Sequence, residues 1–225
     1  DHSDASVHIE DRGYQFADGV YEVFAILNGK IVDYMGHINR LYRSLNEINI
    51  KSPIARDAYI FHLRNLIRRN KINDGLIYLQ VTRGVVERDF KFPKNTKPSL
   101  VITAKRISMK DYDLKFNKGI RVKITNDLRW KRVDIKTLNL LPPVLAKQNA
   151  VESGCDEAWM IDNDGYITEG SSSNAWILIK DKLITTPATS SILKGITRTS
   201  LIKSLKKQKI KIVEKKFNLS DIRKA

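Results

Sequence analysis

The sequence predicts an α/β protein built from two halves, each of the α+β type. The chain of 225 residues is long enough for two modest domains with adequate hydrophobic cores. Short runs of alternating apolar and polar residues, separated by turn residues, predict strands and hairpins. Between them lie segments whose apolar residues recur every three or four positions, which is the helical period. We find no internal repeat and no low-complexity segment.

The first half begins with a predicted hairpin. "GVYEVFAILNGKIVDY" contains two alternating runs that meet at Asn28-Gly29, a dipeptide suited to the positive φ of a tight turn. The next segment, "GHINRLYRSLNEINI", carries an apolar stripe that predicts a helix, and a second helix is expected over residues 56–69. Strands are expected at "LIYLQVTRG" and "SLVITAKRI".

A polar, irregular segment follows and serves as the predicted linker. We therefore expect a small N-terminal α+β domain over residues 1–107, a linker over 108–118 and a larger cofactor-binding domain over 119–225.

The second half repeats this mixture of elements. We expect a strand at "IRVKITND" and a helix over 144–152, with Pro142 and Pro143 in its first turn. Two hairpins are expected to turn at 163–165 and 180–181. The remaining expectations are a helix in "ILKGITRTSLIKSLKKQ", a strand in "KIVEKKF" and a final helix in "NLSDIRKA" capped by Ser220.

The net charge of +15 permits nucleic-acid binding but does not require it. The basic residues are spread along the whole chain, and even the densest cluster, residues 203–216, fits a solvated face. We therefore expect neither nucleic acid nor a membrane as partner. The single cysteine, Cys155, and an N-terminal stretch that is acidic rather than basic and apolar favour a cytoplasmic protein.

A few residues are candidates for chemistry on their own. Lys136 lies in a partly apolar segment, where desolvation would free its amine for Schiff-base formation, although such a lysine is more often a surface residue. Lys147 is a rival in a helical setting. Gly195 precedes a helix start that would suit a phosphate, although an ordinary helix entry is the commoner meaning. Arg40, beside His37, could equally be a surface group. No metal-ligand spacing occurs among the four histidines and one cysteine.

The stretch "YITEGSSSNAWIL" places one carboxylate, Glu169, at the end of a predicted strand, followed by a run of small polar residues. With five further blocks in the same order, it resembles the D-amino acid aminotransferases, which belong to the fold-type IV enzymes that use pyridoxal phosphate (PLP). The other blocks are "DRGYQFADGVYEV", "HINRLY", "QVTRG", "DIKTLNLL…VLAKQ" and "ILKGITR".

The resemblance implies a two-domain PLP fold-type IV architecture with the cofactor between the domains, and a homodimer. It implies that Lys136 forms the Schiff base with PLP and shuttles a proton, and that Glu169 pairs with the pyridine nitrogen. The other implied cofactor contacts come from side chains near the ring and from phosphate-binding groups. They are Arg40, Ser171, Ser172, Ser173, Leu193, Ile196 and Thr197.

Tyr21 and Arg88 match positions that hold the substrate carboxylate, so the implied reaction transfers an amino group from a D-amino acid such as D-alanine to a 2-oxo acid. The family places a histidine two residues after this arginine, where this chain has Phe90. The family also continues beyond "FNLSDIRKA", so we expect the cofactor domain to be C-terminally incomplete. The alternatives are a branched-chain aminotransferase, an aminodeoxychorismate lyase or a truncated, non-catalytic remnant.

Overall fold

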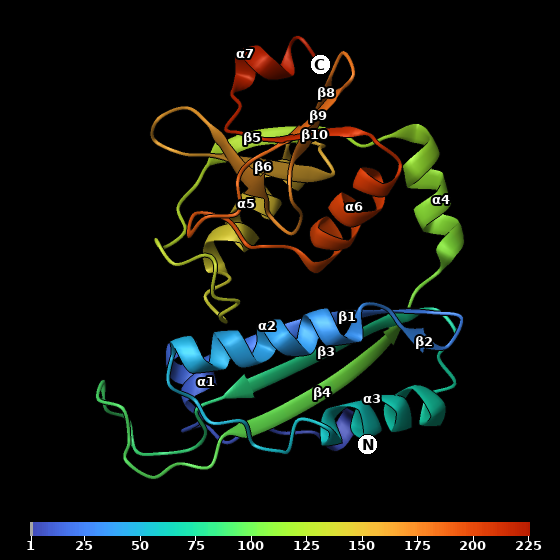
Figure 1. The fold of residues 1–225 in the computed structure, drawn as a ribbon. Helices are drawn as coiled ribbons and strands as arrows, with labels where there is room; N and C mark the ends of the chain where they lie inside the picture. The colour runs from blue at the N-terminus through green and yellow to red at the C-terminus, as the bar shows by residue number, and fades with distance from the viewer. Residues whose placement is uncertain (1) are drawn as a thin grey trace. The chain divides into compact units, whose positions relative to one another are not determined.

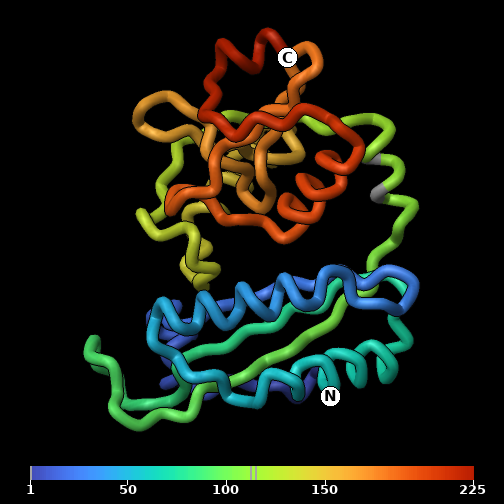
Figure 2. Tube along the Cα trace, viewed as in Figure 1, coloured from blue at the N-terminus to red at the C-terminus, as the bar shows by residue number. Residues whose placement is uncertain are grey.

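The computed structural model describes residues 2–225, and the side chains of all of these except Tyr112 and Lys115. The chain divides into two compact units. Unit 1 contains the residues up to Met109 together with Ile135–Asn139, and unit 2 contains Lys110–Asp134 and Leu140–Ala225. The division differs from the predicted one, because Ile135–Asn139 belongs to unit 1. Figure 2 traces the chain coloured by residue number.

Unit 1 is built on an antiparallel sheet with the strand order β2-β1-β3-β4 (Figure 1). The predicted hairpin is confirmed: β1 (Gly19–Leu27) and β2 (Lys30–Ile31) are joined at Asn28 and Gly29, whose φ angles are 50° and 70°. β3 (Gly75–Thr82) pairs with both β1 and β4 (Ser99–Arg106). Alternate residues of β1 and β3 are fully buried, as the period of two requires for a sheet covered on one face.

Two helices supply the rest of the unit 1 core. α2 (Tyr34–Glu47) and α3 (Ala58–Arg69) confirm the two predicted helices to within a few residues. Their apolar stripes share one hydrophobic cluster with the buried residues of β1 and β3. Two short helices near the N-terminus, η1 (His2–Asp4) and α1 (Arg12–Phe16), were not predicted from the sequence.

Unit 2 contains two three-stranded sheets, with the orders β5-β6-β7 and β10-β9-β8 (Figure 1). The first consists of β5 (Val122–Asn126), β6 (Glu157–Ile161) and β7 (Ile167–Gly170). The second consists of β8 (Trp176–Ile179), β9 (Lys182–Thr185) and β10 (Lys211–Glu214). Both predicted hairpins are present, as β6–β7 and β8–β9.

The core of unit 2 joins these two sheets. Ile167 of β7, Ile177 of β8 and Ile184 of β9 form one buried cluster with Phe217, which is fully buried. α5 (Leu141–Glu152) packs on β6 through its buried alanines, and α6 (Ile196–Lys207) lies against β10. This packing fixes the end of β7 and the start of α6, which carry several of the expected site residues.

The structure corrects two expectations about local structure. The segment predicted to be irregular forms the helix α4 (Met109–Lys118), whose Leu114 and Phe116 are exposed. The apolar side chains described for α4 are all substantially exposed and form no buried stripe, so the usual amphipathic signal of a helix is weak in this segment. The last helix, α7 (Leu219–Ile222), is capped by Asn218 in a capping box with Asp221, and not by Ser220. Across residues 2–225, helices that are both long and apolar enough to cross a membrane are absent.

Candidate functional site

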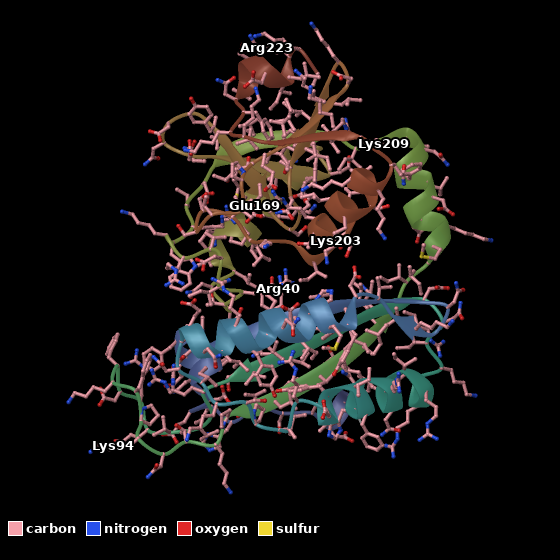
Figure 3. All side chains as sticks on the ribbon, viewed as in Figure 1. Arg40, Lys94, Glu169, Lys203, Lys209 and Arg223 are labelled. Carbon is pink, nitrogen blue, oxygen red and sulfur yellow. The ribbon has the colours of Figure 1, made fainter. Side chains whose placement is uncertain are left out.

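Glu169, one of the expected site residues, accepts hydrogen bonds from three different groups. Its side chain is 6% exposed at the end of β7 and lies in the interior of unit 2 (Figure 3). It accepts hydrogen bonds from the Arg129 guanidinium, from the Leu193 backbone N–H at 3.1 Å and from the Asn174 amide at 2.8 Å. Burial raises the pKa of Glu169, and Arg129 opposes this rise. Three donors thus hold a buried carboxylate in one orientation.

The start of α6 lies close to this carboxylate within unit 2. The Asn174 amide also donates to the Leu193 carbonyl at 3.0 Å, and a Cβ on Gly195 would lie 2.2 Å from the Asn174 Oδ1. Gly195 is the N-cap of α6 and provides no side-chain cap, so the backbone N–H groups of the first turn, at Ile196 and Thr197, can accept an anion. The Glu169 carboxylate and the segment that leads into α6 are therefore connected through Asn174.

The serines that follow β7 converge on a different acid. Ser171, Ser172 and Ser173 all donate to the buried Glu157, the latter two at 3.3 and 3.1 Å. Glu157 also accepts a hydrogen bond from the backbone N–H of Ala158 at 2.8 Å. Burial acts to raise the pKa of Glu157, but these hydrogen bonds outweigh it, so the pKa is lowered. Glu157 therefore fixes the serine loop, and the direct contacts of Ser171 and Ser172 with a cofactor stay a prediction.

Lys136 belongs to unit 1, where a short backbone ladder holds it against β1. The Tyr21 N–H donates to the Lys136 carbonyl at 3.0 Å, and the Lys136 N–H donates to the Ser44 hydroxyl at 3.3 Å. The Lys136 Nζ lies 4.0 Å from the centroid of the Tyr21 ring, which is a cation–π contact. The structure thus brings together two of the expected site residues, Lys136 and Tyr21. Tyr21 in turn contacts Tyr78, with ring centroids 5.5 Å apart.

Arg40, labelled in Figure 3, is held on α2 by a buried acid that the sequence reasoning missed. Its Nε and Nη2 each donate to the Glu22 carboxylate at 2.7 Å, and the His37 Nδ1 lies 2.7 Å from the same carboxylate. Glu22 is fully buried, yet these partners lower its pKa against the effect of burial. The signal in the sequence is its position, because Glu22 alternates with Val20 and Phe24 on the buried face of β1.

Removing the Glu22 charge is expected to destabilise the protein strongly. Glu22→Gln leaves the Arg40 fork without its anion in a buried setting, which costs about 3 kcal/mol in unfolding free energy. The loss should be present above pH 4.5 and vanish as the pH falls through the lowered pKa of Glu22, because the parent carboxyl is then protonated as well. Urea unfolding at several pH values measures this.

Glu47→Gln is the matched control, on α2, the helix that carries Arg40. Glu47 pairs with Arg43 at 3.7 Å in a largely exposed i,i+4 contact, which is worth below about 1 kcal/mol. Equal losses for Glu22→Gln and Glu47→Gln would contradict the buried role of Glu22.

Arg88 lies in an exposed part of unit 1 beside two phenylalanines. Its guanidinium carbon is 5.0 Å from the ring centroid of Phe16 and 5.8 Å from that of Phe90. The two rings contact each other edge to face at 5.5 Å. The segment is anchored by Arg12, whose Nη1 donates to the Asp89 carbonyl at 2.5 Å. Phe90 thus stands beside Arg88 as an apolar neighbour.

The site contains three further residues that the sequence reasoning did not identify: Arg129, Asp127 and Asn174. Arg129 contacts Asp127 through two guanidinium nitrogens, Nε at 2.9 Å and Nη2 at 2.7 Å. Arg129 and Asp127 lie in an irregular stretch of the chain, so neither periodicity nor a motif marks them. Asn174 closes the quoted "TEGSSSN" block, and its position was the only available signal.

Comparisons with known proteins place the chain in a family. The model of the family "Amino-transferase class IV" matches residues 19–225. The chain is 42% identical to the D-alanine aminotransferase of Listeria monocytogenes serotype 4b over 99% of its own length and 77% of the relative's length. It is 40% identical to the D-alanine aminotransferase of Staphylococcus aureus strain MSSA476, over 99% of this chain and 78% of that one.

Solved structures show the same fold. A branched-chain amino acid aminotransferase of Escherichia coli superposes with a TM-score of 0.91 at 24% identity, covering 99% of this chain and 76% of the other. A putative 4-amino-4-deoxychorismate lyase from Legionella pneumophila gives a TM-score of 0.87 at 24% identity, covering 97% and 80%. The predicted fold is confirmed, and the chain belongs to the class IV aminotransferase family.

Proposed function

We propose that this class IV aminotransferase transfers the amino group of D-alanine, or a related D-amino acid, to a 2-oxo acid. The observation that carries the proposal is 42% identity to a D-alanine aminotransferase along 99% of the chain. Class IV aminotransferases use PLP, so this chain is a PLP-dependent transaminase. When bound, PLP supplies a conjugated ring that accepts the electron pair left on the substrate Cα after proton removal.

The residues of unit 2 fit the two polar ends of this cofactor. Glu169 is a buried carboxylate oriented by Arg129 and Asn174, and in the proposal it pairs with a protonated ring nitrogen. The uncapped first turn of α6 at Ile196 and Thr197 suits the phosphate. Leu193 lies between these two features and contacts the carboxylate through its backbone N–H. In the proposal, Leu193 also packs against the ring.

Lys136 supplies the amine in the proposal. Its Nζ would hold the cofactor covalently, and the same amine, once free, would act as the general base that moves the substrate Cα proton. The half-buried position and the Tyr21 ring 4.0 Å from Nζ limit the conformations that this amine can adopt. Arg40, fixed by Glu22, adds a cation for the phosphate.

Arg88 and Tyr21 bind the substrate carboxylate in the proposal. The guanidinium fork of Arg88 can engage both carboxylate oxygens, and Phe16 and Phe90 restrict its side chain from one side. Phe90 provides no hydrogen bond, so carboxylate recognition depends on Arg88 more than it would with a histidine at this position.

The proposal includes the family's expected assembly and location. A homodimer would cover the apolar residues that α5 exposes at Leu141, Val144 and Leu145, which recur on one helix face and are more than half exposed. A location in the cytoplasm agrees with the single free cysteine, Cys155.

The test is the conversion of D-alanine to pyruvate by the PLP-loaded protein in the presence of 2-oxoglutarate. We expect pyruvate from D-alanine and little from L-alanine. Turnover of L-leucine or L-valine without turnover of D-alanine would replace the proposal with a branched-chain aminotransferase. PLP retention without turnover of either enantiomer would favour the lyase, and failure to retain PLP would favour a non-catalytic remnant.

A further inference from the structure

Arg129 lies between two buried carboxylates of unit 2. It makes a two-pronged contact with Asp127, at 2.9 and 2.7 Å, and its Nη1 donates to Glu169. All three side chains are close to nine-tenths buried or more, with exposed fractions of 8% for Arg129, 11% for Asp127 and 6% for Glu169. Thr168 adds a donor to Asp127 at 2.7 Å. This charge triad, Asp127–Arg129–Glu169, is therefore removed from solvent and bonded throughout.

With both carboxylates ionised, the charge triad would carry one negative charge more than its single cation balances. Arg129 makes a bidentate contact with Asp127. This contact lowers the pKa of Asp127 against the effect of burial. Glu169 receives a single donor nitrogen, and burial raises its pKa while Asp127 adds to the rise. Arg129 is the largest influence in the opposite direction, so it is the group that favours the ionised form of Glu169.

Arg129 also fixes where Glu169 points. Its Nη2 donates to the Ser191 carbonyl at 3.3 Å, while Leu193, two residues later, donates its N–H to Glu169 at 3.1 Å. One guanidinium thus ties the end of β7 to the segment that leads into α6. Without it, Glu169 would lose one of the two donors on its Oε1 and the charge that opposes its protonation.

We propose that Arg129, clamped by Asp127, is a positioning residue that keeps Glu169 ionised and aligned, and that the uncompensated charge of the triad selects a protonated ring nitrogen on the cofactor. This inference rests on the proposed function. Arg129 acts through Glu169 and contacts neither substrate nor reacting atoms.

The first arm of the test measures cofactor affinity. PLP and an analogue with carbon in place of the ring nitrogen are titrated into the cofactor-free parent, Arg129→Met and Arg129→Lys, with quenching of tryptophan fluorescence as the readout. For Arg129→Met we expect at least about tenfold weaker PLP binding, little change for the analogue and partial rescue by Arg129→Lys. Equal weakening of both ligands, or of neither, would overturn the inference.

Arg132→Met is the matched control. Arg132 makes a similar local contact with Asp134, at 3.0 and 3.1 Å, but its side chain is 45% exposed. Its substitution should leave the affinity for PLP and for the analogue within about twofold, since an exposed pair contributes little.

The second arm needs no cofactor and remains informative if Arg129→Met folds poorly. The ionisation of Glu169 is followed by carboxyl carbon NMR in protein labelled at glutamate, with Glu169→Gln to assign the signal. We expect Asp127→Asn to lower the pKa of Glu169, because Arg129 then pairs with Glu169 as its only anion in the triad. We expect Arg129→Lys to raise the pKa of Glu169. Shifts of the Glu169 pKa in any other direction would overturn the inference. Failure of the parent protein to bind PLP would instead refute the proposed function.

Discussion

Lys136→Ala is expected to abolish transamination. The substitution removes the amine that binds the cofactor and moves the Cα proton, so the rate should fall at least about 10³-fold. The measurement is pyruvate formation from D-alanine at saturating PLP. The backbone bonds of Lys136 to Tyr21 and Ser44 do not involve its side chain, so the fold of unit 1 should survive.

Lys131→Ala provides the comparison, since Lys131 is an exposed lysine only five residues earlier. It should keep near-parent activity. Full activity in Lys136→Ala, with Lys131→Ala unchanged, would remove Lys136 from the mechanism.

Glu169→Gln is expected to lower activity by about 10²-fold or more, because a preorganised charge that supports the electron-accepting ring is lost. The same change has a second, cofactor-free signature. Burial raises the pKa of Glu169 above 4.5, so the folded state holds this proton more tightly than the unfolded state. The stability contributed by Glu169 therefore falls as the pH rises through the window that begins at 4.5.

In the cofactor-free protein, the unfolding free energy of Glu169→Gln relative to the parent should therefore increase with pH above 4.5. Glu157→Gln is the matched control, because the pKa of Glu157 is lowered and its stabilising effect is lost as the pH falls below 4.5. Urea unfolding between pH 4 and 8 distinguishes the two. Parallel pH profiles for the two variants would contradict the assigned environment of Glu169.

Much of the fold was predictable because its signals are local. The turn at Asn28-Gly29, the apolar stripe of α2 and the prolines in the first turn of α5 each depend on a few neighbouring residues. The helix α4 was not predictable in this way, because it is polar around much of its surface. The assignment of Ile135–Asn139 to unit 1 depends on pairing with β1, more than 100 residues earlier in the chain.

The candidate site shows the same difference between residues with a local sequence signal and residues defined by long-range contacts. Lys136 and Glu169 were identified from motifs of adjacent residues, and their roles stay predictions. Glu22 had a readable signal, a carboxylate on the apolar face of a strand, which its partners Arg40 and His37 explain. Arg129 could not be found, because its contact with Glu169 joins residues 40 positions apart and its own segment has no regular pattern.

Borohydride reduction of the PLP-loaded protein, followed by peptide mapping, tests whether Lys136 carries the cofactor. Reduction converts a Schiff base between PLP and a lysine into a stable bond that mass spectrometry can locate. We expect one phosphopyridoxyl group per chain, attached to Lys136, and release of the cofactor from that lysine when D-alanine is added before reduction. A group on another lysine, or no retained group at all, would contradict it.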